Sequence, residues 1–109
     1  MRLRNNPDAM PFLQEHADLV FINPRDRLGK WHEVFGNDNP IAIEIGMGKG
    51  DFIIENARRN PNINFIGIEK YSTVLTIAVK KSLEMETLPN LRFMKEDAAV
   101  LGEVFAEGE

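Results

Sequence analysis

The 109-residue sequence contains no cysteine and no long apolar run. Without thiols it forms neither disulfide bonds nor thiolate metal sites, which fits a reducing compartment. No stretch reaches the roughly 20 apolar residues that span a bilayer, and no apolar signal-peptide core follows the N-terminus. The formal net charge of −4 gives no overall basic excess, so any RNA contact must come from a local patch. We therefore expect a cytoplasmic protein built around one small core.

The chain divides into two segments that differ in proline content and in hydrophobic pattern. Residues 1–40 contain four prolines between short amphipathic pieces, and helices are expected there near 11–16 and 27–35. Residues 41–109 alternate apolar runs with longer helical patterns. We interpret the first segment as a helical N-terminal segment and the second as the main α/β domain.

Three apolar runs in the second segment have the length and composition of buried strands. They are "IAIEI" at 41–45, "NFIGIE" at 64–69 and "LRFMKE" at 91–96. Helical patterns near 51–60 and 72–86 connect them. This strand–helix alternation predicts three parallel strands with right-handed crossovers, which is half of a doubly wound fold.

A glycine-rich loop follows the first of these strands. Gly46, Gly48 and Gly50 alternate in "EIGMGKGDF", at the edge of the sheet where α/β folds bind ligands. The spacing G-x-G-x-G differs from the dinucleotide fingerprint G-x-G-x-x-G, and Lys49 is not followed by the Ser or Thr of a P-loop. The loop therefore predicts a nucleotide-like ligand, or else only a tight turn between strand and helix.

Carboxylates are expected at the same edge. Glu69 ends the second strand 23 residues after Gly46 (69 − 46), where an acid can accept hydrogen bonds from ribose hydroxyls. Asp97 follows the third strand, and it could instead cap a helix. Glu44, two residues before the first glycine, would repel a pyrophosphate and favour a cationic sulfonium, unless a structural partner satisfies it. These acids favour S-adenosylmethionine over NAD.

The motifs "GNDNPI", "IEIGMGKG", "NFIGIEK" and "KEDA" together carry a family resemblance. Over its whole length the chain resembles the N-terminal half of the bacterial tRNA (guanine-N7-)-methyltransferase family, which has a Rossmann-like fold and uses S-adenosylmethionine. The resemblance implies tRNA contacts at basic positions of the N-terminal segment: Arg2, Arg4, Arg25 and Arg27. It implies cofactor contacts at Glu44, Gly46, Gly48, Gly50, Glu69, Lys70, Asp97 and Ala98.

The resemblance also implies that family members continue for about as many residues again, into a fourth strand and an acidic Trp-Pro-rich loop. That half would hold the guanine, so no catalytic residue is assigned here. Two other functions stay open: a non-catalytic nucleotide-binding fragment, and a fragment of an NAD-dependent oxidoreductase. Without a fourth strand beside it, the apolar strand 41–45 would be an exposed edge through which two copies could dimerise.

Overall fold

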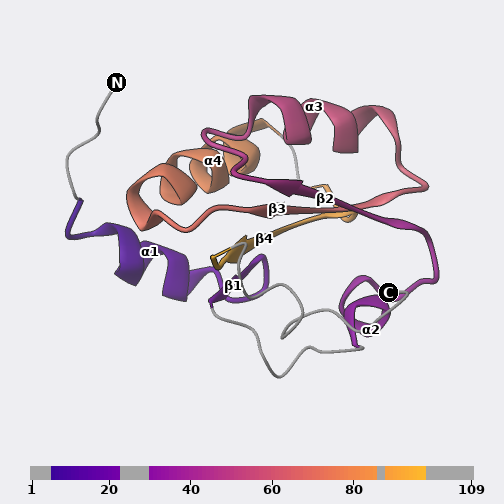
Figure 1. Ribbon diagram of the computed structural model, residues 1–109, viewed down its shortest axis with the longest axis horizontal. Coiled ribbons are helices and arrows are strands. Elements are labelled where there is room, and N and C mark those ends of the chain that lie inside the picture. The colour runs from indigo at the N-terminus through magenta and orange to yellow at the C-terminus, as the bar shows by residue number, and fades with distance from the viewer. Residues whose placement is uncertain (1–5, 23–29, 86–87, 98–109) are drawn as a thin grey trace.

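The computed structural model describes residues 6–22, 30–85 and 88–97, which form one parallel sheet with helices around it (Figure 1). The chain is built in the order α1 (Ala9–Glu15), β1 (Val20–Ile22), α2 (Trp31–Phe35), β2 (Ile41–Ile45), α3 (Asp51–Arg59), β3 (Asn64–Ile68), α4 (Ser72–Met85) and β4 (Leu91–Lys95). None of the helices in these ranges is long and apolar enough to cross a membrane.

The sheet has the strand order β1-β4-β3-β2, and every neighbouring pair is parallel. This confirms the α/β class and the parallel arrangement of the three strands that the sequence predicts. The strands β3 and β4 each end one residue earlier than expected, so Glu69 and Glu96 lie just beyond their carboxyl ends. Acids in this position face the ligand edge of a parallel sheet.

The sequence predicts three strands, and this number is wrong, because the described part of the sheet contains four. The additional strand β1 comes from the N-terminal segment and pairs with β4, with Val20 opposite Phe93 and Ile22 opposite Lys95. Three residues are too few to show the alternation of apolar and polar residues that identifies a strand. The segment becomes a strand because it pairs with the edge of β4, and its own sequence pattern does not specify this. The division of the chain at residue 40 remains a prediction.

Each face of the sheet carries its own apolar cluster. On one face, Ile53 and Ile54 of α3 and Leu75 and Val79 of α4 pack together, and Leu13 of α1 joins them. On the other face, Trp31 of α2 packs against Ile66, Ile68 and Met94. Figure 1 shows α3 and α2 on opposite sides of the strands. Trp31 is fully buried, as its helical spacing predicts.

The helix boundaries agree with the turn chemistry of the sequence. Gly36 ends α2 in the left-handed conformation with φ of 74°, as expected for a glycine after a helix. The helix α1 begins before Pro11 and contains it in its first turn, where proline costs no intrahelical hydrogen bond. Of the helix expected over 27–35, residues 27–29 lie outside the described ranges.

Gly50 lets α3 and α4 approach each other closely. Its φ is 83°, and a Cβ built on it would lie 2.9 Å from Cβ of Ala78 in α4. We expect Gly50→Ala to lower the free energy of unfolding by about 3 kcal/mol, because it combines backbone strain with overpacking. The matched control is Gly36→Ala, which has φ of 74° and no atom within 4 Å, and should lose about 1 kcal/mol. Urea denaturation measures both, and equal losses would show that the contact with Ala78 contributes nothing.

Candidate cofactor site

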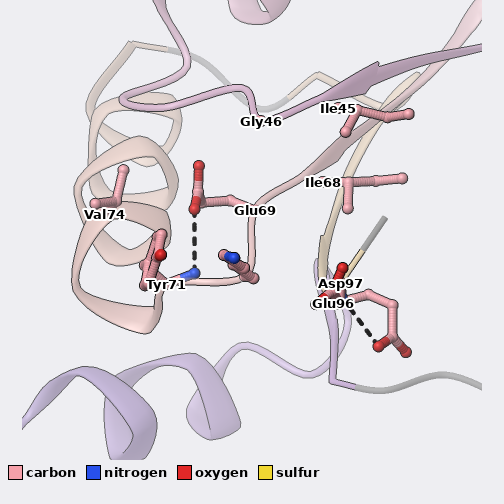
Figure 2. A pocket seen from close by; sticks show the side chains of 9 residues that line it. Ile45, Gly46, Ile68, Glu69, Tyr71, Val74, Glu96 and Asp97 are labelled. Carbon is pink, nitrogen blue, oxygen red and sulfur yellow. Dashed lines mark hydrogen bonds between the residues drawn. The ribbon is translucent and has the colours of Figure 1, made fainter. Parts of the chain in front are cut away.

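A cavity of about 290 Å³ opens at the carboxyl ends of the strands, beside the glycine loop (Figure 2). It brings together four of the residues singled out from the sequence, which come from three different strand ends. The nine lining residues are Ile45, Gly46, Ile68, Glu69, Lys70, Tyr71, Val74, Glu96 and Asp97. That any of them binds a cofactor stays a prediction.

Glu69 connects the carboxyl ends of β2 and β3, which are two of the three strand ends that form the cavity. Its Oε1 accepts a hydrogen bond from the amide of Gly48 at 3.3 Å, and its Oε2 accepts one from the amide of Tyr71 at 3.1 Å. The residue is 8% exposed. A carboxylate has about four lone-pair directions, so two remain for donors of a ligand such as ribose hydroxyls. The position of Glu69 is therefore fixed before any ligand arrives.

The amides of the glycine loop point toward β3. Gly46 and Met47 both donate to the carbonyl oxygen of Ile68, at 2.8 Å and 3.2 Å, and Gly48 donates to Glu69. A dinucleotide loop instead offers its amides to a pyrophosphate. Three consecutive amides are already engaged here, which disfavours a pyrophosphate at this loop.

The three glycines of the loop differ in their surroundings. Gly46 and Gly48 have φ of 66° and 60°, and a Cβ built on either would meet no atom within 4 Å. Open space beside a left-handed backbone leaves room for a ligand to approach. Gly50 is buried against Ala78 and does not line the cavity, so its packing role alone accounts for the glycine.

The cavity combines apolar walls with an excess of negative charge. In the part of the lining that the structure describes, Glu69, Glu96 and Asp97 accompany a single cation, Lys70. Figure 2 shows Glu96 and Asp97 together at the end of β4, where the amide of Asp97 donates to Oε1 of Glu96 at 3.1 Å. Carboxylates therefore outnumber ammonium groups in the described part of the lining, and Glu69 is the one whose two printed hydrogen bonds leave lone pairs for a ligand.

Glu44 lies apart from the cavity. It is opposite Gly67 in the register of β2 and β3, and a Cβ on Gly67 would meet Met47 and Ile53, so Glu44 faces the side of the sheet covered by α3. Its Oε2 is buried and has no hydrogen-bond partner among the residues that the structure describes. This burial raises the pKa of Glu44 above its ordinary value of 4.5. An unpaired carboxylate oxygen is costly and fits a cationic partner beside the loop.

Several residues of the sites predicted from sequence remain untested by the geometry. Gly48 adjoins the cavity through its hydrogen bond to Glu69 but does not line it. Ala98 and the four arginines of the N-terminal segment lie outside the described residues.

Sequence reasoning missed Glu96 and the apolar walls of the cavity. Glu96 stands in the quoted motif "KEDA", and a second strand-end acid was the available signal. Ile45 and Ile68 give no signal of their own, since a strand-end isoleucine has the same composition wherever it points.

Comparison with known proteins places the chain in a family. Residues 38–109 match the model of a family described as putative methyltransferases. The chain belongs to this family. Over all 109 residues it is 53% identical to a tRNA (guanine-N(7)-)-methyltransferase of Lachnoclostridium phytofermentans and 53% identical to one of Geobacillus sp.. It covers 50% and 49% of those two proteins, so it spans about half the length of the curated relatives it matches.

S-adenosylmethionine is the methyl donor that this family implies, and the residues present fit it. The donor carries a sulfonium cation, two ribose hydroxyls and an adenine. Carboxylates suit the hydroxyls, the acidic surroundings suit the cation, and Ile45, Ile68 and Val74 offer apolar surface to a ring. The open space at Gly46 and Gly48 admits a ligand close to the backbone.

The unpaired oxygen of Glu44 makes the stability of the free protein depend on pH. Burial raises the pKa of Glu44 in the folded state. Its stabilising contribution to the free energy of unfolding is therefore fully present below about pH 4.5 and is lost as pH rises through the raised pKa. Glu44→Gln should therefore match the parent at low pH and exceed its unfolding free energy at pH 7, by up to about 1 kcal/mol given the partial burial.

The control for Glu44→Gln is Glu55→Gln on the outer side of α3. Hydrogen bonds from Arg58 and Arg59 lower the pKa of Glu55 to about 2, so its contribution is present above about pH 4.5 and is lost as pH falls toward 2. Urea denaturation between pH 3 and pH 8 measures both variants. If the two substitutions changed the free energy of unfolding with the same pH dependence, the raised pKa assigned to Glu44 would be wrong.

Proposed function

We propose that this chain holds S-adenosylmethionine for the methylation of guanine N7 in tRNA. The cofactor part is supported by the acidic cavity beside the glycine loop, in which Glu69 has lone pairs left for ribose hydroxyls. The acceptor part is carried by the 53% identity to two tRNA (guanine-N(7)-)-methyltransferases along the whole chain.

The proposed reaction requires no general base from this chain. The donor supplies an electrophilic methyl group on a sulfonium sulfur, and guanine N7 carries a lone pair, so the attacking nitrogen needs no base. The residues at the strand ends bind and orient the donor, with Glu69 on the ribose and Asp97 beside the adenine. Apolar walls at Ile45, Ile68 and Val74 exclude water from the donor.

The tRNA and the location belong to the same proposal. Arg2, Arg4, Arg25 and Arg27 are proposed contacts to RNA phosphates, since basic side chains supply the sequence-independent part of such binding. A cytoplasmic location is proposed together with the acceptor, because bacterial tRNA is used for translation in the cytoplasm.

Binding of S-adenosylhomocysteine tests the cofactor site. We expect the parent chain to bind it in calorimetric titration and Glu69→Ala to bind at least about tenfold more weakly, because the variant loses both the ribose acceptor and the tether to Gly48. Glu33→Ala is the control, since Glu33 is an exposed acid on α2 outside the cavity. Equal affinities of the parent and Glu69→Ala would refute the assignment.

The same titration separates the two alternative functions. A fragment of an NAD-dependent oxidoreductase would bind NADH, whereas the engaged loop amides and the three carboxylates of the cavity disfavour a pyrophosphate. A non-catalytic nucleotide-binding fragment would bind a nucleotide without transferring a methyl group, and a chain that binds no nucleotide would respond to neither ligand.

We further propose that two copies of this chain associate through β2. This strand is one of the two edge strands of the described sheet, so one row of its backbone groups has no strand partner there. Ile43 and Ile45 are 41% and 55% exposed along it. An apolar edge with unpaired amides and carbonyls is a template for strand pairing, and a second copy offers an identical one.

A charge on the strand tests this association. We expect the parent to sediment as a dimer at micromolar concentrations and Ile43→Lys to sediment as a monomer, because an edge lysine resists pairing. The control is Phe52→Lys, which removes an aromatic ring that is 70% exposed on α3 and leaves the strand intact. A stable, monodisperse parent monomer in analytical ultracentrifugation would refute the proposal, and so would equal dissociation by both variants.

A further inference from the structure

One buried side chain fills the space between the glycine loop and the sheet. Met47, in the middle of the loop, is 6% exposed. A Cβ built on Gly67 of β3 would lie 2.3 Å from Sδ of Met47 and 3.2 Å from Cδ1 of Ile53. No real Cβ tolerates the first distance, so the thioether occupies the place that a side chain at position 67 would take.

This contact complements the hydrogen bonds that join the loop to β3. The bond from Gly46 to Ile68 measures 2.8 Å, whereas those from Met47 to Ile68 and from Gly48 to Glu69 measure 3.2 Å and 3.3 Å, at or just beyond the long end of the range for amide donors. They fix which backbone groups face each other, whereas packing of Met47 on Gly67 sets the separation between the loop and the strand. Neither Met47 nor Gly67 lines the cavity, so both act through neighbours that do or that adjoin it.

We propose that Met47 and Gly67 form a positioning pair, which sets the height of the glycine loop above β3 and thereby the affinity of the cavity for an adenosine-containing methyl donor. The second half of this statement rests on the proposed function; the first half does not. Because Gly46 lines the cavity and Gly48 is tethered to Glu69, raising the loop changes the cavity wall and loosens the carboxylate that accepts the ribose. Gly67 is thus required by a loop rather than by its own backbone conformation.

Substitutions on the two sides of the contact test the pair. Gly67→Ala adds a methyl group where Sδ lies, and we expect it to weaken S-adenosylhomocysteine binding about tenfold in calorimetric titration. Adding Met47→Ala vacates that space, so the double variant should return to within about threefold of the parent. The matched control is Gly67→Ala with Ile53→Val, which removes the other close atom, Cδ1, and should leave the tenfold loss in place.

A second readout needs no ligand. In the free protein, Gly67→Ala should shift the backbone amide resonances of Gly46 and Gly48, which are distant from it in sequence, and adding Ile53→Val should leave those shifts in place. Should Gly67→Ala not fold, the affinity of Met47→Ala carries the test, because loss of the thioether must weaken binding, and an unchanged affinity would overturn the pair.

The outcomes separate this inference from the proposed function. Unchanged amide shifts and unchanged affinity in Gly67→Ala would overturn the pair, because the unbranched methionine would then have moved aside without moving the loop. Equal recovery with Ile53→Val would also overturn it, since the contact would act through α3. A parent that binds no S-adenosylhomocysteine, together with the expected amide shifts in Gly67→Ala, refutes the cofactor assignment and supports the loop contact.

Discussion

The candidate site depends on how the carboxyl end of β3 supports the glycine loop. Three consecutive residues of β3 and its extension each hold one part of the loop: Gly67 receives the side chain of Met47, Ile68 accepts two amides, and Glu69 accepts a third. A loop with three left-handed glycines has little conformational preference of its own. Its shape is therefore imposed by the neighbouring strand, and the parallel pairing of β2 with β3 brings that strand into place.

The same arrangement changes the functional interpretation of the glycine-rich loop. A glycine-rich loop after a strand suggests amides held ready for an anion, but here the amides are used inside the protein. What remains for a ligand is open space at Gly46 and Gly48, and a rim of carboxylates that come from two other strand ends. This distribution of charge suits a cationic ligand better than a pyrophosphate, and it agrees with membership of a methyltransferase family.

The sequence predicted the strands that have a clear local pattern. It did not predict the structural features that depend on contacts with residues far away in the chain. The strands at 41–45, 64–68 and 91–95 are predominantly apolar runs, and Glu69 and Asp97 follow two of them. The meeting of these two acids at one edge could therefore be deduced from parallel topology. The strand β1 could not, since three residues become a strand only against the edge of β4. Likewise, nothing local distinguishes Gly50, which packs on Ala78, from Gly46, which borders the cavity.

Glu44 illustrates the limit of reading a residue by its position in a motif. Its place before the first glycine suggested a direct contact with the ligand, yet its register with Gly67 turns it toward α3 and away from the cavity wall. One oxygen of Glu44 is buried without a hydrogen-bond partner among the described residues, so replacement by an apolar residue of similar size would relieve a cost rather than create one. We predict that this carboxylate acts on a cationic ligand through its charge, at a distance, whereas Glu69 acts on the ligand by contact.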